Sequence, residues 1–356
     1  ATPSRVGKPA GSGKLYKHKD PFPEDIAFDG ETEFLDGGVW RYHPTKDRFE
    51  VMAHGFSNPW GVDYDAKGQM FISACVIPHL WHVVQGGIYH RQGGKHINPY
   101  FYSDIRTIAD HRHRSAHGGA RVYLSDAMPE KYMNRIFMAN IHEHAVLSDI
   151  LEPNGSGFIG RHGDDFMLAN NAQWIGFSME IGPAGDLYVL DWHDADICGN
   201  DVVNKDTGRV FRIRSTEVEP ENFPHRYDDL TTLSDEQLAS LQTSRSVWHA
   251  RQARVILQHR SGSRAIHPAA LAQLTNIYEG ENSDHRLRAL WALHVINQLP
   301  VSLGKVNLVS ALQDDDEYIR AWAIQLACED GQPAVEVGER LPEMATSDPS
   351  PVVRLY

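Results

Sequence analysis

A sequence cue that returns about every 59 residues constrains the fold of this chain more than any other feature. The segment GVDYDAKGQMFI at 61–72 reappears as SMEIGPAGDLYV at 178–189, and residues 119–140 hold a related pair of runs between them. Each unit has two runs of alternating apolar residues, which predict two strands. In the first and last units the turn contains Gly68 or Gly185, where a positive φ is expected. A long, fixed period of strand pairs is typical of β-propeller blades.

A second cue, with Gly at its start and β-branched or aromatic residues after it, occurs at 38–42, 87–91 and 208–213. This composition suits an outer blade strand. We therefore expect an all-β propeller segment of about three blades in residues 36–215, and a loop or insertion in residues 1–35. A β-sandwich with similar glycine turns is the alternative. Closed propellers usually have four to eight blades, so the missing blades are expected on an upstream segment or on another chain.

The hydrophobic period becomes helical at residue 234, after an expected linker at 216–233. Ser234 and Gln237 stand at capping-box spacing, which predicts a helix start. The apolar run at 285–296 recurs at 317–327 and begins again at 351–356. Three arginines spaced by 32 and 34 residues each follow aspartates suited to an N-cap: Arg288 after Asp284, Arg320 after Asp314–Asp316, and Arg354 after Asp348. This period predicts an all-α segment of HEAT-like repeats over 234–356, with an unrelated helical bundle as the alternative.

Charge and cysteine content exclude several classes of function. The 356 residues include 47 Asp and Glu against 34 Lys and Arg, and the net charge of −13 repels the phosphate backbone of nucleic acids. The three cysteines form no Cys-x-x-Cys pair, so no haem-attachment motif and no cysteine-rich zinc site is expected in this stretch. The apolar runs are far shorter than the ~20 residues of a membrane-spanning helix.

Twenty histidines, several of them beside expected strands, point to metal or acid–base chemistry. One group includes His117 and lies in the segment 110–119, DHRHRSAHGG. A second, His142 and His144, ends the run 135–144, and residues two apart on a strand present both imidazoles on one face. A third group, Asp191, His193 and Asp194, occupies the equivalent place in the next unit, where carboxylates suit a hard cation such as Ca²⁺. Surface histidines with ordinary hydrogen bonds and a solvated acidic turn are the alternatives.

Several motifs resemble those of a known enzyme family. The segments NPWG at 58–61, DAKG at 65–68 and GPAGDLYV at 182–189 resemble the glucose/sorbosone dehydrogenase propellers, which use pyrroloquinoline quinone and calcium. The segments GVWRYHP at 38–44, AHGGARVY at 116–123, DILEP at 149–153 and GRVFRI at 208–213 are similar to the planctomycete-type membrane-bound dehydrogenase domain proteins. In those proteins HEAT-like repeats and then a c-type haem domain follow the propeller. The resemblance covers about residues 37–356.

The resemblance implies an extracytoplasmic oxidoreductase, periplasmic or membrane-associated. It also implies calcium and pyrroloquinoline quinone as cofactors, with Asn58, Trp60 and Arg121 as cofactor-binding residues. The chain departs from the quinone-binding members at Ser57 and at 74–76, where those members have Arg and a polar Gly-Pro run.

Two functional hypotheses follow. In the first, the chain is a dehydrogenase-like module that oxidises a sugar, alcohol or aldehyde and passes electrons to a haem domain or a cytochrome c partner outside this stretch. The catalytic candidates are then His117, His142 and Asp191, with either histidine as the general base, and the metal candidates are His142, His144, His193 and Asp194. In the second hypothesis, propeller and solenoid form a non-catalytic scaffold that binds a glycan or a protein.

Overall fold

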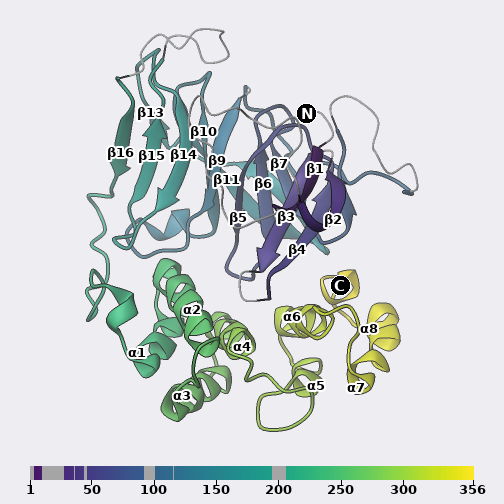
Figure 1. Cartoon of the computed structure of the whole chain (residues 1–356). Coiled ribbons are helices and arrows are strands. Elements are labelled where there is room, and N and C mark those ends of the chain that lie inside the picture. Colours follow the sequence, from purple (N-terminus) through teal and green to yellow (C-terminus); the bar gives the residue numbers. More distant parts are fainter. Residues whose placement is uncertain are drawn as a thin grey trace.

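The strand-rich and helix-rich parts of the chain follow one another as the sequence predicts (Figure 1). The structure, a computed structural model, describes residues 37–43, 46–91, 101–114, 116–194 and 206–356, and the backbone alone of 4–9 and 28–35. Strands occupy the part up to Ile213, and helices begin at Asp235. No helix among these residues is long and apolar enough to cross a membrane.

Between residues 38 and 213 the described strands form four small, mainly antiparallel sheets. The first has the order β3-β4-β8 and the second β5-β6-β7. The third has the order β12-β11-β10-β9, with β13 beside β11, and the fourth β14-β15-β16. The strands are β3 Gly38–His43, β4 Arg48–His54, β5 Pro59–Tyr64, β6 Met70–Ala74, β7 Leu80–Val83, β8 Gly87–Ile88, β9 His117–Val122, β10 Arg135–Asn140, β11 Ala145–Asn154, β12 Gly157–His162, β13 Met167–Leu168, β14 Gly176–Ile181, β15 Leu187–Asp191 and β16 Arg209–Ile213.

The repeat of about 59 residues corresponds to contacts between neighbouring sheets. The backbone N–H of Val122 donates to Asp63 Oδ2 over 2.9 Å, and Arg121 Nε donates to Glu180 Oε2 over 3.0 Å; the two residues of each pair are 59 apart. The first strands of the three units, β5, β9 and β14, therefore lie side by side. The approach is close, because a Cβ on Gly61 would lie 2.3 Å from the carbonyl carbon of Gly119. Small sheets joined along their first strands are the blades of a propeller-like fold.

The structure differs from the sequence prediction in two places. The described residues between 38 and 213 hold four sheets where about three blades were expected, because β3, β4 and β8 form a sheet of their own outside the 59-residue period. Residues 1–35, expected as a loop or insertion, contain the paired strands β1 Ser4–Pro9 and β2 Phe28–Leu35. These two strands were missed because neither shows a regular alternation of apolar and polar residues, the signal on which a strand prediction rests.

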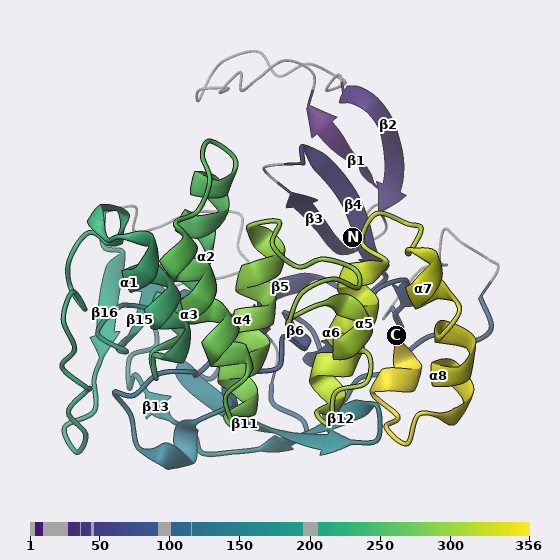
Figure 2. The same ribbon diagram turned by 90° about the horizontal axis from the view of Figure 1, so that it is seen from below.

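The helical part forms two layers below the blades (Figures 1 and 2). Helices α2, α4 and α6 lie next to the sheets, and α1, α3 and α5 lie farther away. The helices are α1 Asp235–Ser240, α2 Val247–Ser261, α3 Pro268–Tyr278, α4 Ser283–Val295, α5 Leu308–Ala311, α6 Glu317–Ala327, α7 Val335–Gly338 and α8 Leu341–Ser347. Their apolar faces share one core, which includes Leu238, Leu257, Leu290 and Ile319.

Helix starts follow the capping signals in two cases of four. The Ser234–Gln237 capping box opens α1, and Asp316 caps α6 by accepting from Tyr318 N and Ile319 N. The predicted cap Asp284 is wrong, since Asn282 caps α4 and its side chain accepts from His285 N. Asn282 is the N-cap because its backbone is extended, which places the side-chain amide oxygen over the first turn of α4. Asp284 lies inside the helix and so cannot be the N-cap. The predicted cap Asp348 precedes only a short 3-10 helix, Val353–Leu355, whose N-cap residue is Val352 and lacks a side-chain cap hydrogen bond.

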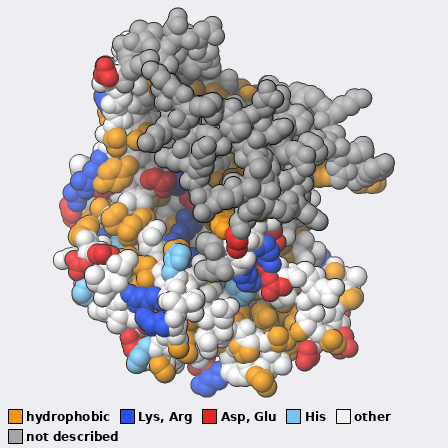
Figure 3. All heavy atoms as spheres, in the orientation of Figure 1, with side chains coloured by type: hydrophobic (Ala, Val, Ile, Leu, Met, Phe, Trp, Pro, Cys, Tyr) orange, Lys and Arg blue, Asp and Glu red, His pale blue; other side chains and the backbone are white. Residues whose placement is uncertain are grey.

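Hydrogen bonds and ion pairs join the two parts of the chain. Arg251 of α2 donates to Asp63 Oδ1 over 2.9 Å, and Trp322 Nε1 of α6 donates to Lys67 O over 2.7 Å. The expected linker is anchored as well, because Arg226 forms a bidentate pair with Asp126. Figure 3 shows basic and acidic side chains close together on one face, and Lys46 and Arg48 of the blades form ion pairs with Asp330 after α6. The helices are therefore attached to the blades by specific polar contacts.

Candidate metal centre

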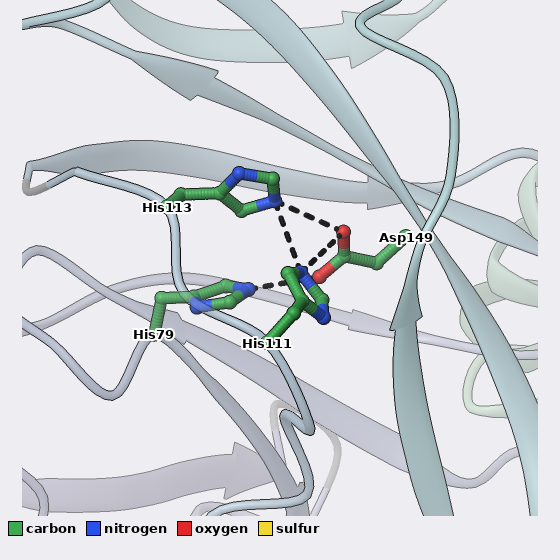
Figure 4. A group of neighbouring side chains, drawn as sticks. All are labelled: His79, His111, His113 and Asp149. Atoms are coloured by element: carbon green, nitrogen blue, oxygen red, sulfur yellow. Dashed lines mark hydrogen bonds and ion pairs between the residues drawn. The ribbon is translucent and has the colours of Figure 1, made fainter.

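Three histidines and one aspartate converge between two neighbouring blades (Figure 4). His79 Nε2 lies 2.8 Å from Asp149 Oδ2, while His111 Nε2 and His113 Nε2 lie 3.1 and 3.2 Å from Asp149 Oδ1. The Nε2 atoms of His111 and His113 are 3.1 Å apart. One ligand atom from each of the four residues falls within 4.8 Å of all the others.

The chain segments that carry these side chains are held by backbone hydrogen bonds. His79 ends the loop between β6 and β7, where its carbonyl accepts from Ala74 N. The segment before β9 is held between two strands: Ile108 N donates to Leu80 O of β7, and Gly160 N of β12 donates to Ile108 O. This places His111 and His113 opposite Asp149 of β11, so the centre joins two blades.

The centre is buried. The side chains of His79 and Asp149 are 0% exposed, and those of His113 and His111 are 7% and 16% exposed. Burial by itself raises the pKa of Asp149, but hydrogen bonds with His111, His113 and His79 outweigh it and hold the pKa far below its usual range. Burial lowers the pKa of His79. Burial also opposes protonation of His111, yet the hydrogen bond and charge of Asp149 raise its pKa. The Asp149 carboxylate is thus ionised, and burial disfavours a charge on the His79 imidazole beside it.

This donor set fits a first-row transition metal ion. In a tetrahedral site with metal–nitrogen bonds of about 2.0–2.1 Å, neighbouring ligand atoms are roughly 3.3 Å apart. The His111, His113 and Asp149 atoms, 3.1 to 3.2 Å apart, are close to this value, and all four ligand atoms lie within 4.8 Å of one another. Imidazole suits zinc, copper, iron and nickel, and a single carboxylate lowers the charge of the site. His111 Nδ1 lies 3.1 Å from Gly160 O and 3.3 Å from Asp110 Oδ1, the partners that direct the other ring nitrogen toward a metal.

Two more histidines surround the four ligands. The ring of His117 stacks on that of His79 with centroids 4.6 Å apart, and the ring of His162 lies 4.9 Å from that of His113. Burial, together with the charges of His79 and His113, lowers the pKa of His117 to about 2. Within the described residues, neither His117 Nδ1 nor His79 Nδ1 has a hydrogen-bond partner. His117, predicted as a general base, is thus a buried neutral imidazole at the edge of the centre.

The prediction that His142 and His144 share one face of a strand is wrong. Strand β10 ends at Asn140, and residues 141–144 form a turn. The Asn140 side chain stops the strand, because its Oδ1 accepts from the backbone N–H groups of His142 and Glu143. His142 is exposed, and His144 Nδ1 binds the carbonyl of Trp174 at 2.8 Å. The structure does not bring this pair, proposed as metal ligands, into the cluster.

The acidic turn after β15 is held by its own hydrogen bonds. Asp191 Oδ1 accepts from Ile175 N and His193 N, and its Oδ2 lies 2.7 Å from Arg209 Nη2. Asp194 is buried. Over the part of the turn that the structure describes, Asp191, His193 and Asp194 form no group of three metal ligands; Asp196 lies outside that part. Asp191 therefore holds this turn in place, and its catalytic role stays a prediction.

The structure brings the three predicted cofactor-binding residues together. Asn58, Trp60 and Arg121 line one cavity of about 620 Å³ over the first strands of the blades, together with the exposed Trp40. Trp60 packs edge-on against Phe177 with ring centroids 4.9 Å apart. Because Gly119 also lines this cavity and His117 begins the same strand, β9 borders both the cavity and the histidine cluster.

Sequence reasoning missed the four ligands as a set. His111 and His113 stand in the histidine-rich segment before β9, and Asp149 opens the DILEP motif, so both signals were present in the sequence. His79 precedes β7 with no distinctive pattern around it. The cluster forms only when segments 30 to 70 residues apart meet between two blades.

No curated protein matches the sequence. Among solved structures, the chain is similar to an oxidoreductase (glucose dehydrogenase) from Thermus thermophilus, with 23% identity and a TM-score of 0.34 over 46% of each chain. Two further structures, both of glucose dehydrogenases, are 16% identical to it. One has a TM-score of 0.32 over 47% of this chain and 43% of the other, and the second has 0.33 over 48% of both. The chain spans about half the length of these structures.

A family model with the description "Domain of unknown function (DUF7133)" matches residues 13–219. This range is more than half of the 356 residues, and it contains the four ligands of the candidate metal centre and the cavity residues Asn58, Trp60 and Arg121. The chain therefore belongs to the DUF7133 family.

Proposed function

We propose that this chain is a metal-dependent oxidoreductase module. The observation that carries the proposal is the convergence of His79, His111, His113 and Asp149 on one buried point. The Nε2 atoms of His111 and His113 lie only 3.1 Å apart beside the same carboxylate oxygen. Two protonated Nε2 atoms this close repel each other, whereas a bound cation would accept a lone pair from each of them. A buried site of three imidazoles and one carboxylate suits redox-active ions such as iron and copper as well as zinc.

The residues of the chain have distinct tasks in this proposal. The metal, when bound, supplies either a redox couple or a Lewis acid. Asp149 keeps the negative charge that holds the ion, and the hydrogen bond from His111 Nδ1 to the Gly160 carbonyl fixes the direction of its ring. The buried His117 keeps bulk water away from His79 by its ring contact, and the exposed His162 packs on His113.

The substrate class follows from the cavity on the other side of β9. Its aromatic side chains, Trp40 and Trp60, with the polar Asn58 and Arg121, suit a sugar or another small alcohol or aldehyde. Pyrroloquinoline quinone fits this cavity less well. Arg121 is already paired with Glu180, and no acidic side chain lines the described cavity to hold calcium. No step is therefore assigned to the quinone or to calcium.

Helical support, further blades and an electron acceptor form the proposed setting of the module. The two layers of helices act as HEAT-like repeats that support the blades, and further blades on an upstream segment or another chain complete the ring. Electrons pass to a haem domain or a cytochrome c outside this chain, in an extracytoplasmic compartment. These statements extend the resemblance of the sequence to the dehydrogenase domain proteins.

Metal analysis of the purified protein tests the proposal. After incubation with zinc, iron, manganese or copper and desalting, we expect about one metal ion per chain in the wild type and in a His142→Ala control. We expect a loss of at least tenfold in His113→Ala. If no metal is retained by the wild type, or if His113→Ala retains it equally, the centre does not exist.

Dye-linked oxidation of a panel of sugars, alcohols and aldehydes tests the activity. Metal-loaded wild type and His142→Ala should reduce the dye, and His113→Ala should not. A metal-loaded protein that is inactive on every substrate would contradict the oxidoreductase and favour the non-catalytic binding scaffold.

A further inference from the structure

A second cavity, of about 390 Å³, lies between the blades and the helices. Its walls come from the β5–β6 turn and from one face each of α2, α4 and α6. The turn is fixed against the helices, because Trp322 Nε1 donates to Lys67 O and the Trp322 and Trp291 rings lie edge to face with centroids 5.1 Å apart. The cavity is thus built by both parts of the chain and is separate from the histidine cluster.

Most of the wall is apolar. The lining side chains without charge include Val247, Val255, Val295, Leu326, Trp291 and Trp322. Val255 is 46% exposed and lies where the cavity meets solvent. A cavity of this size and lining suits the hydrocarbon part of a small organic molecule.

Three arginines line the same cavity, and within the described residues only Arg251 forms an ion pair with an acidic side chain. Arg251 donates to Asp63 Oδ1 over 2.9 Å. Arg254 Nη1 donates to the neutral Gln242 Oε1 over 3.1 Å, and its guanidinium lies 5.1 Å from the centroid of the Trp291 ring. Arg288 donates to the backbone carbonyl of Ser244 over 2.8 Å.

Asp65 also lines the cavity, but its carboxylate does not neutralise these arginines. Asp65 is used within the β5–β6 turn, where its Oδ1 accepts from Lys67 N and Gln69 N. Burial, with the charges of Arg251 and Arg288, lowers the pKa of Arg254 to about 9, so its guanidinium is still protonated at neutral pH. Burial also lowers the pKa of Arg288 and outweighs the charge of Asp284, which raises it. A cation withdrawn from water without a close ion pair is unfavourable, and an anion in the cavity would offset this cost. The buried Nε1 of Trp291 also has no hydrogen-bond partner in the part of the chain that the structure describes.

We propose that this cavity binds a small organic acid, with its carboxylate on Arg254 and Arg288 and its apolar body between Val255, Val295 and the two tryptophans. Arginine guanidinium groups match a carboxylate geometrically and give strong charge-assisted hydrogen bonds. Because the ligand would contact the β5–β6 turn, α2, α4 and α6 at once, binding also couples the blades to the helices. The site does not depend on the metal centre.

Calorimetric titration of the full chain with octanoate tests this proposal. We expect saturable binding of one octanoate per chain, and weaker binding of octan-1-ol, which has the same body without the charge. Arg254→Met should weaken octanoate binding about tenfold or more, since a charge-assisted hydrogen bond is removed. Arg254→Lys should retain part of the affinity. Arg214→Met, at an exposed arginine before the helices, is the matched control and should bind as the wild type does.

A second variant covers the case in which Arg254→Met does not fold. Val255→Trp leaves the arginines intact, fills the cavity from its exposed edge and should abolish octanoate binding. Equal affinity for octanoate and octan-1-ol, or full binding by Val255→Trp, would overturn the proposal. Tighter binding of inorganic phosphate than of octanoate would overturn the organic-acid class.

Discussion

Arg226 and Asp126 illustrate how this chain holds a buried charge. Their side chains are 1% and 0% exposed, and two guanidinium nitrogens donate to the two carboxylate oxygens over 2.8 and 2.7 Å. The same guanidinium also donates to the carbonyls of Pro183 and Glu221. One residue of the segment before the helices therefore joins two blades.

We expect Arg226→Met to lower the free energy of unfolding by about 3–5 kcal/mol, because it leaves the Asp126 carboxylate buried without its partner. Urea unfolding followed by circular dichroism measures the change. The exposed Arg214→Met is the control. A loss of less than about 1 kcal/mol for Arg226→Met would show that water replaces the guanidinium.

Gly68 offers a test of close packing at a single residue. Its φ of +76° and that of Gly86, +77°, are nearly equal. A Cβ on Gly68 would lie 2.6 Å from the Trp322 ring, whereas one on Gly86 meets nothing within 4 Å. Both alanine variants carry the same backbone strain, so the difference between them isolates the contact with the tryptophan.

Gly68→Ala should therefore be less stable than Gly86→Ala by about 1–3 kcal/mol, the usual range for overpacking. Parallel thermal and urea unfolding of the two variants measures this difference. Equal stability would mean that the β5–β6 turn moves away from α6 without loss.

At the scale of elements, one glutamate ties a strand pair to two helices. Glu329, just after α6, lies 2.8 Å from His294 Nε2 of α4 and 3.1 Å from Lys46 Nζ in the β3–β4 turn. The hydrogen bond from His294, together with that from Lys46, outweighs burial and lowers the pKa of Glu329 to about 2. The unfolded chain binds this proton more readily than the folded one, so the contribution of Glu329 to stability is present above about pH 4.5.

Acidification from about pH 4.5 to pH 2 should remove that contribution, at most about 3 kcal/mol. Urea unfolding at intervals across this range should show a steeper loss of stability in the wild type than in Glu329→Gln. Other buried carboxylates such as Asp235 also lose stability in acid, so the comparison with the variant is essential. Parallel curves for the two proteins would contradict the assignment.

At the scale of the whole molecule, the histidine cluster joins two neighbouring blades. His79 belongs to the second sheet and Asp149 to the third, with His111 and His113 on the segment between them. A metal bound there crosslinks the two blades, and its binding free energy adds to the stability of the folded chain.

Free metal at a thousand times its dissociation constant should therefore stabilise the wild type by about 4 kcal/mol, and a chelator should reverse this. Thermal unfolding with and without metal measures the effect, with His113→Ala as the variant that does not respond and His142→Ala as the one that does. If metal does not change the melting temperature of the wild type, the centre does not contribute to the stability of the fold.

Local sequence signals predicted the structure correctly where it depends on residues close together in the chain. The Gly68 and Gly185 turns have the positive φ that their position in the repeat predicts, and Ser234 with Gln237 forms the expected capping box. The predicted strand pairs of the 59-residue repeat were also confirmed, because alternating apolar residues indicate a strand with one buried face. The β1–β2 pair was missed because it depends on backbone pairing between the two strands. The turn at His142 was missed because it depends on a hydrogen bond to the Asn140 side chain.

By itself the sequence determined the kinds of element, their order, the period of the blades and the presence of many histidines near strand ends. Only the tertiary structure decided which histidines meet. His79, His111, His113 and Asp149 lie on three segments that are separated along the chain, and the packing of β7 and β12 around residue 108 brings them together. The same holds for Arg254 and Arg288. That neither forms an ion pair with an acidic side chain of the described residues is apparent only once the helices pack against the β5–β6 turn. Local propensity acts over a few residues, whereas a site depends on contacts between segments that are distant in the sequence.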